Sequence, residues 1–245
     1  MIGFITFITL LTVVANIVGT VSGFGVSTIM TPILLFYLPF PETILLVCII
    51  HWFHDVWKMG FFFHGIDWKL FLYFGIPTII ATFLGALLVS SEQSALLSML
   101  LGLFLIASVA VMYLIPYLAL PYNWITGTVG GLLSGFFAGI FGIRGAVRSV
   151  FLAAFDLHKA TFIGTTGAIS LLLDSTRFVT YFFINGLRVE SLPWWAFIFF
   201  VVASLVGAYI GYLIVDKIPQ RKFRFVVAAF LFLVGVKLLI TPWLF

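Results

Sequence analysis

Long apolar runs, each followed by a short break rich in proline, glycine or polar residues, make up nearly the whole sequence. A helix that crosses a membrane needs about 20 predominantly apolar residues, and several of these runs reach that length. From this pattern we predict an all-α, polytopic membrane protein. The breaks divide the chain into ten expected helical elements, at residues 2–20, 26–38, 42–63, 67–90, 94–116, 124–141, 145–155, 159–184, 191–215 and 222–244.

The composition excludes the main alternatives to a membrane protein. Of the 245 residues, 63% are hydrophobic and 8% are charged, whereas a soluble domain carries about 25% charged residues and a disordered chain has low hydrophobicity. The net charge of +4 fits the positive-inside rule better than it indicates a nucleic-acid partner. The first 21 residues lack a basic leading segment, so we expect a retained helix and not a cleaved signal.

Nothing in the sequence points to an enzyme. The motifs HExxH, GxSxG and GxxxxGK[ST], which mark zinc hydrolases, serine hydrolases and phosphate-binding loops, do not occur. The single cysteine, Cys48, lies in an apolar run, so an internal disulfide framework and a site with several thiolate ligands are both excluded. We expect no cofactor and no metal site.

The two halves of the sequence resemble each other at an offset of 119 residues. We therefore expect two transmembrane repeats, 1–118 and 119–245, within one membrane unit. Each repeat has about five helical elements, with a short helix after a glycine-rich break, and an odd number of crossings inverts the second repeat relative to the first. The offset places a break, an aromatic residue, an acid and a base on their counterparts: Gly23 on Gly142, Phe36 on Phe155, Asp55 on Asp174 and Lys58 on Arg177.

The loop charges favour ten crossings, although a count of eight stays open. With ten, the bases near Lys58, Lys69 and Lys159 and those in 217–224 share one side of the membrane, Arg188 lies on the other side, and both termini are outside. With eight, the short element after each glycine break joins its neighbour in one crossing, and the repeats are parallel. The short elements reach only about 16–20 Å, which is less than the hydrocarbon thickness.

Two arginines flank the start of the short element after the second break. Arg144 and Arg148 are four residues apart, so they share one face of a helix. The N-terminus of that helix adds free N–H groups and the positive end of its dipole, and planar guanidinium groups match the oxygens of a carboxylate, sulfonate or phosphate. This pattern predicts an anion site. The alternative is that the arginines pair with acids or extend to a nearby surface.

A polar stripe with i, i+4, i+7 spacing occurs at matching positions in both halves. Its members are His51, Asp55 and Lys58 in the first half and Ser170, Asp174 and Arg177 in the second. A charge at the centre of a membrane helix costs about 2.5–3.5 kcal/mol, so such residues usually face the bundle interior or a cavity. We predict two symmetry-related polar stations that couple or gate transport. The alternative is an acid–base pair in each helix that only neutralises itself.

The glycines fall into two groups. Those in the first group recur at helical spacing within one expected helix and predict close helix packing. They are Gly127, Gly130, Gly131, Gly135 and Gly139. Those in the second group stand at the two breaks, where a short element follows, and favour an opened backbone that a ligand can approach. They are Gly23, Gly25, Gly142 and Gly145.

Two segments resemble the signatures of a known family. Residues 19–34, GTVSGFGVSTIMTPIL, and residues 127–147, GTVGGLLSGFFAGIFGIRGAV, are similar to the first and second signatures of the TauE/SafE (TSUP) family of membrane exporters. The resemblance covers essentially the whole chain. It implies a secondary transporter of small sulfur anions, often outward, in a prokaryotic-type cell (inner) membrane. Arg144 departs from the run of glycines that members often have at the second break.

Residues and resemblance together lead us to expect a proton-coupled exporter of a sulfur oxyanion or sulfonate. Its partners would be that anion, protons and the lipid bilayer, and not nucleic acid. His51 would carry the proton, since imidazole titrates near neutral pH, and the acid–base pairs of the stripes would exchange between inward- and outward-open states. An anion channel and a membrane subunit without transport activity are the alternatives. The residues expected to hold the anion are Arg144, Arg148, Gly23, Phe24, Gly25, Gly142 and Gly145.

Overall fold

The computed structural model confirms the all-α prediction in the part of the chain that it describes. Within that part, regular structure is helical throughout. The expected elements 145–155 and 222–244 fall mostly outside it. The described residues are 1–22, 25–89, 94–114, 121–143, 148, 151–152, 155, 157–215, 232–233, 235–236 and 239–240.

The helices follow most of the expected elements closely. Their bounds are α1 (Ile2–Ser22), α2 (Ser27–Leu34), α3 (Phe40–Phe61), η1 (Phe63–Gly65), α4 (Trp68–Leu70), η2 (Phe71–Gly75), α5 (Ile76–Leu87), α6 (Ser94–Leu114), α7 (Trp124–Phe141), α9 (Lys159–Val179), η3 (Thr180–Ile184) and α10 (Ala196–Ile214). The expected start of the last of these at residue 191 is wrong. Pro193 disfavours a helical conformation of the residue before it, and α10 begins at Ala196.

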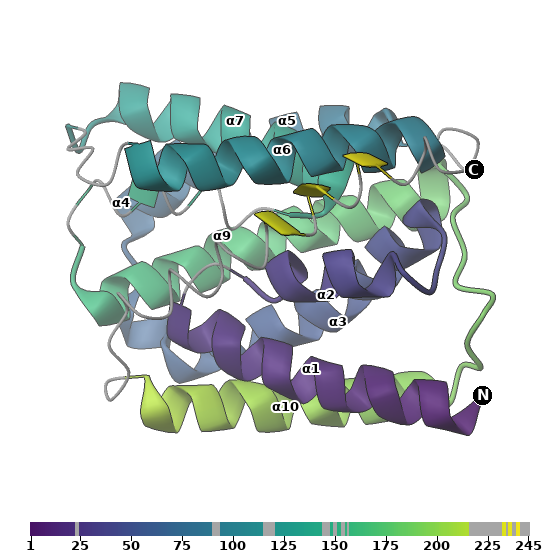
Figure 1. The fold of residues 1–245 in the computed structure, drawn as a ribbon. Helices are drawn as coiled ribbons and strands as arrows, with labels where there is room; N and C mark the ends of the chain where they lie inside the picture. Colours follow the sequence, from purple (N-terminus) through teal and green to yellow (C-terminus); the bar gives the residue numbers. More distant parts are fainter. Residues whose placement is uncertain are drawn as a thin grey trace.

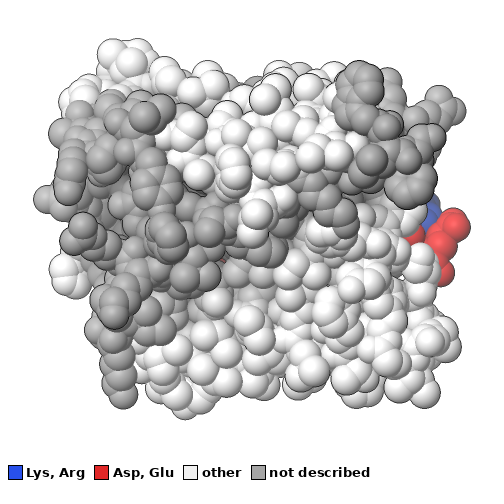
Figure 2. Space-filling model, in the orientation of Figure 1, with Lys and Arg blue, Asp and Glu red and all other residues white. Residues whose placement is uncertain are grey.

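Six helices of the described part are long and apolar enough to cross a membrane. They are Ile2–Val21, Phe40–Phe61, Trp68–Leu87, Trp124–Phe141, Thr161–Ile184 and Ala196–Ile214. Figure 2 shows a broad face on which the described atoms are almost all uncharged, with the visible charged atoms at one end. Such a surface matches the hydrocarbon of a bilayer. The protein is therefore an integral, multi-pass membrane protein, and the number of its crossings stays a prediction.

Two pairs of parallel helices form opposite sides of the bundle (Figure 1). α1 packs against α10, with Gly207 beside Val13 and Gly211 beside Ile17. In the same way α5 packs against α7. Since the partner residue numbers rise together, both pairs run parallel.

The α3 and α9 helices lie between these two pairs (Figure 1) and run antiparallel. Gly167 lies against Lys58, and Gly164 lies against the carbonyl of Phe62. A loop contact fixes the same alignment at one end, where the backbone N–H of Asp67 donates to Thr165 Oγ1 at 2.8 Å. The polar stripes of α3 and α9 therefore face each other at the centre of the bundle.

Glycines of α7 allow its close contact with α5, which confirms the packing prediction. A Cβ on Gly135 or Gly139 would collide with a backbone carbonyl of α5, and one on Gly131 would collide with the Phe74 carbonyl of η2. A Cβ on Gly130 would lie 2.7 Å from the Phe74 and Phe151 rings, and one on Gly127 would lie 3.0 Å from Tyr73 Cβ. Small residues bring membrane helices into backbone contact in this way.

The short helix α2 follows the first glycine break, as expected from the sequence. Its 8 residues reach about 12 Å. Gly25 precedes it with a φ of +89°, a conformation that glycine adopts without strain. The helix packs against α3 and α1, and most of its residues are buried. Gly25, the residue of the first break that the structure describes, is itself buried.

Candidate functional site

Five charged side chains are buried among the described residues. They are Asp55, Lys58, Arg148, Asp174 and Arg177, and none is more than 2% exposed. Taking an ion out of water costs several kcal/mol even after the protein relaxes around it. Ionisable groups at such depth in a membrane protein are therefore the first candidates for a functional site.

The two polar stripes meet in one cluster between α3 and α9. Each aspartate is paired with the base of its own stripe: Lys58 Nζ lies 3.2 Å from Asp55 Oδ1, and Arg177 Nη1 lies 2.9 Å from Asp174 Oδ1. His51 joins the halves, because its Nδ1 lies 3.1 Å from Asp55 Oδ2 and 3.3 Å from Asp174 Oδ2. We predicted two stations, and antiparallel packing brings them together as one.

The His51 ring also contacts the first glycine break. The backbone N–H of Val26 donates to His51 Nε2 at 3.1 Å. A backbone N–H can only donate, so Nε2 is the unprotonated nitrogen of the ring. The hydrogen of neutral imidazole is then on Nδ1, where it points at the two carboxylates. One side chain thus connects the α2 N-terminus, α3 and α9.

The acids and the histidine of this cluster could in principle hold a metal ion. One ligand atom each from His51, Asp55 and Asp174 lie within 4.8 Å of one another. However, Lys58 and Arg177 already balance the two carboxylates. A divalent cation would add charge to a neutral group in a medium of low dielectric constant. The donor set fits a shared proton better than a metal ion.

Arg177 connects the cluster to the second glycine break. Gly142 ends α7 with a φ of +72°, and a Cβ there would lie 2.7 Å from Arg177 Nη2. The same guanidinium donates through Nη2 to the carbonyl of Ile44 at 3.5 Å and through Nε to Tyr181 Oη at 3.3 Å. Tyr181 in turn donates to the carbonyl of Gly139. Arg177 is therefore held by α3, α7 and α9 together.

Arg148 contacts α9 nearer to the N-terminus of that helix than the Asp174–Arg177 pair. Its Nη1 donates to Ser170 Oγ and, at 3.4 Å, to the carbonyl of Thr166. Ser170 is one helical turn from Asp174. The polar stripe of α9 therefore has a guanidinium group on each side of Asp174, that of Arg148 toward Ser170 and that of Arg177 one turn later.

Comparison with known protein families adds an independent finding. Residues 8–238, which include both breaks and the whole charged cluster, match the family described as Sulfite exporter TauE/SafE. The chain belongs to the TauE/SafE family. No curated protein and no solved structure matches it. TauE/SafE proteins are membrane exporters of sulfur anions and not enzymes, so the buried charges of this member belong to a transporter.

This TauE/SafE protein brings several of the predicted anion-binding residues to the cluster. Arg148 contacts Ser170, and Gly142 contacts Arg177. Gly25 stands at the first break, beside the Val26 N–H that His51 accepts. Others lie outside the described residues. They are Gly23, Phe24, Arg144 and Gly145.

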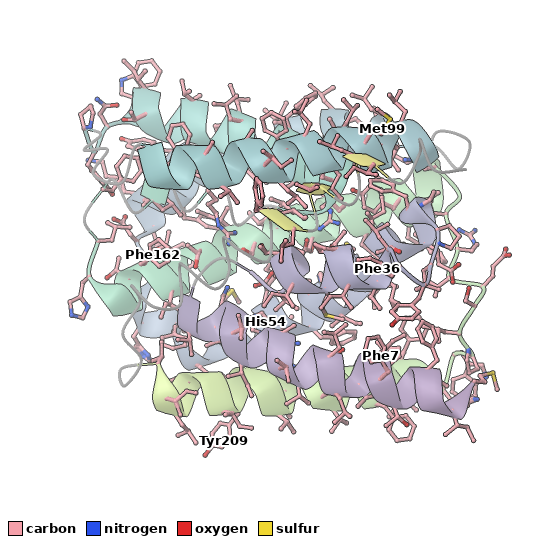
Figure 3. The ribbon with its side chains drawn as sticks, in the orientation of Figure 1. Phe7, Phe36, His54, Met99, Phe162 and Tyr209 are labelled. Carbon is pink, nitrogen blue, oxygen red and sulfur yellow. The ribbon has the colours of Figure 1, made fainter. Side chains whose placement is uncertain are left out.

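Sequence reasoning missed part of the TauE/SafE site. The polar stripe is longer than we predicted. Thr166 of α9 and Tyr181 of η3 extend it at the same spacing, and they contact Arg148 and Arg177. The i, i+4 pattern could have shown this. His54, which is labelled in Figure 3, is buried on α3. Its ring lies edge-on to that of His51, with 5.7 Å between the ring centroids. The i, i+3 spacing of the two histidines could have indicated that contact.

Proposed function

We propose that this chain is a secondary transporter that exports a small sulfur oxyanion or organosulfonate, of the sulfite or sulfoacetate kind, across a prokaryotic-type inner membrane. The observation that carries the proposal is the buried guanidinium of Arg148 on the polar face of α9. With Ser170 on the same face, this guanidinium offers planar hydrogen-bond donors that suit the oxygens of a sulfonate or sulfite.

In this proposal Arg144 and Arg148 bind the anion at the second break. Their spacing places both on one helical face, and Arg148 is already held there by Ser170. Planar guanidinium groups bind two oxygens of a sulfonate or sulfite in a fixed geometry. The backbone at the two breaks supplies further N–H donors, as half-helices do in other transporters. These segments are Gly142 to Gly145 and Gly23 to Gly25.

Coupling in this proposal uses the cluster between α3 and α9. The pairs Asp55–Lys58 and Asp174–Arg177 exchange partners between inward- and outward-open states, and His51 carries the proton. Support comes from the contact of His51 with both carboxylates and from the general ability of an imidazole to gain and lose a proton. Proton movement through His51 would link export to the proton gradient.

We also propose that residues 1–118 and 119–245 are inverted repeats. The pairing of helices supports this arrangement. The first helix of each repeat packs in parallel against the fourth helical element of the other, α1 against α10 and α7 against α5, while the stripe-bearing helices α3 and α9 cross antiparallel. An axis in the membrane plane relates helices in this manner.

Substitution of the two arginines tests the anion site. A charge-assisted hydrogen bond contributes about 1.5–3 kcal/mol, so Arg148→Ala or Arg144→Ala should weaken binding of sulfite or sulfoacetate about ten- to a hundredfold. Arg148→Lys and Arg144→Lys keep the charge but lose the planar fork, so they should also bind more weakly. Affinity is measured by titration calorimetry on the purified chain after a thermal-shift screen with sulfite, sulfate, thiosulfate, sulfoacetate, taurine and carboxylates.

Arg188→Ala is the matched control for these variants. Arg188 is an exposed loop residue that donates to the carbonyls of Phe182 and Leu187, so its loss should leave affinity unchanged. If Arg144 and Arg148 variants all bind like the wild type, the anion site is elsewhere. Accumulation of sulfite against its gradient by reconstituted vesicles distinguishes a transporter from a channel.

A further inference from the structure

We propose that the anion and a proton bind this protein cooperatively, because a proton on His51 releases a backbone N–H of the first break for the anion. The inference rests on the proposed function, and it adds that binding of the proton and binding of the anion strengthen each other. It starts from one nitrogen atom, His51 Nε2, that has two possible partners.

The first partner of His51 Nε2 is the backbone of the first break. In this structure Nε2 accepts the Val26 N–H at 3.1 Å, so the ring is neutral with its hydrogen on Nδ1. The second partner is a proton. An imidazolium ion has a hydrogen on each nitrogen and accepts no hydrogen bond. Protonation of His51 and the hydrogen bond from Val26 therefore exclude each other.

The released N–H belongs to the start of a helix. Val26 is the residue that caps α2, and its N–H is one of the four at a helix N-terminus that have no partner within the helix. Such groups bind anions, because they point outward at the positive end of the helix dipole. In the neutral state, His51 occupies this donor.

A second observation marks the same place as a binding position. Ser27 is fully buried, and its hydroxyl has no hydrogen-bond partner among the described residues. A Cβ built on Gly25 would lie 3.9 Å from Ser27 Oγ and 3.5 Å from His51 Nε2. The hydroxyl and the imidazole therefore border the same small space at Gly25. A buried hydroxyl without a partner costs free energy that an oxyanion would recover.

The charges near His51 also favour binding of the anion together with the proton. Asp55 and Lys58 of α3 and Asp174 and Arg177 of α9 together carry no net charge, and His54 is a further titratable side chain beside the ring. A proton on His51 gives this buried group one positive charge. A bound anion neutralises it, and the proton in turn strengthens anion binding, since coupling between two ligands is reciprocal.

The test is calorimetry on the full-length chain with thiosulfate, which does not change its own protonation over the range used. Affinity should rise as the pH is lowered from about 8 to about 5.5, by up to about tenfold per pH unit where one proton is linked. Titrations in two buffers of different ionisation enthalpy should show proton uptake on binding. His51→Gln can still accept the Val26 N–H, but it should bind thiosulfate weakly, independently of pH and without proton uptake.

His54→Gln is the matched control, because it removes the neighbouring imidazole and should keep both the pH dependence and the proton uptake. Proton release by the wild type, or an affinity that does not change with pH, overturns the inference and leaves the anion site standing. Absence of binding for thiosulfate, sulfite and sulfoacetate at every pH overturns the proposed function and this inference with it. If His51→Gln does not fold, proton uptake by the wild type decides alone.

Discussion

Lys58 and Asp55 form a buried ion pair within a single helix. The ammonium group is 2% exposed and the carboxylate is fully buried, with 3.2 Å between Nζ and Oδ1. A buried pair contributes less to stability than the loss of one partner suggests, because that loss leaves an uncompensated charge behind. Each charge in the cluster therefore depends on its partner, and this makes the pair testable by itself.

Lys58→Met should destabilise the protein by about 3–5 kcal/mol, because it leaves the Asp55 carboxylate buried without its base. The double variant Lys58→Met, Asp55→Asn should cost clearly less than the sum of its single substitutions. Unfolding in detergent, followed by temperature or denaturant in a double-mutant cycle, measures the difference. Additive effects, within about 0.5 kcal/mol, would contradict the pairing.

At the scale of elements, α5 and α7 touch through their backbones. Glycine is present on both sides of the contact, since a Cβ on Gly85 would collide with the Phe136 carbonyl and one on Gly135 with the Thr78 carbonyl. Backbone carbonyls cannot move aside as a flexible side chain can. The interface therefore tolerates added volume poorly, although the chain has other glycines that lie in open space.

Gly135→Ala should destabilise the protein by about 1–3 kcal/mol, because its methyl group must displace the α5 backbone. Gly60→Ala is the control. Gly60 is an exposed position of α3 with no atom within 4 Å of an added Cβ, so alanine should stabilise the helix by about 0.5–1 kcal/mol. Thermal unfolding of the two variants in the same detergent compares them. Equal stability of both variants would place α7 farther from α5 than we find.

The two ends of the helix bundle can be identified from the contacts made near each end of α9. The start of α9 lies at the end where Asp67 contacts Thr165. The segment that follows η3 lies at the other end, where the backbone N–H of Ser191 donates to Glu42 Oε1 at 2.8 Å. Exposed bases mark both ends: Lys69 the first and Arg188 the second. We predict that the membrane separates these two positions.

Single cysteines at Lys69 and Arg188 should react with a membrane-impermeant thiol reagent from opposite sides. The background is Cys48→Ala, and Cys48 is itself buried. Labelling in right-side-out and inverted vesicles gives the sidedness of each position. Ten crossings with inverted repeats require opposite sides, whereas eight crossings with parallel repeats place both positions on one side.

Local pattern was enough to predict the parts of this site but not their assembly. The spacing of Asp174 and Arg177 predicts a paired acid and base on one face, because i, i+3 neighbours on a helix are determined by the helix alone. The contact of His51 with Asp174 depends on how α3 crosses α9, and no spacing within one helix contains that information. Antiparallel packing, set in part by Gly164 and Gly167, is what makes the two stripes one cluster.

The hydrogen bond from Val26 to His51 was beyond prediction for a related reason. The sequence indicates a break at Gly25, and it indicates a polar stripe through His51, but the ring could have turned toward either side of α3. Similarly, the start of α10 was placed too early, because the apolar residues around Leu192 continue across a proline that the helix does not include. Hydropathy marks the membrane-facing length of a segment, while backbone restrictions determine where its helix begins.

The glycine-lined contacts of α1 with α10 and of α5 with α7 each join residues 1–118 to residues 119–245. In the proposed transporter, neither half can move as one rigid block, because that movement would pull the packed backbones apart. We therefore expect each moving body to contain helices of both halves. If the chain were cut between residues 118 and 119, neither polypeptide would contain both helices of a parallel pair. The two polypeptides would fold only together, with α10 packed against α1 and α5 packed against α7.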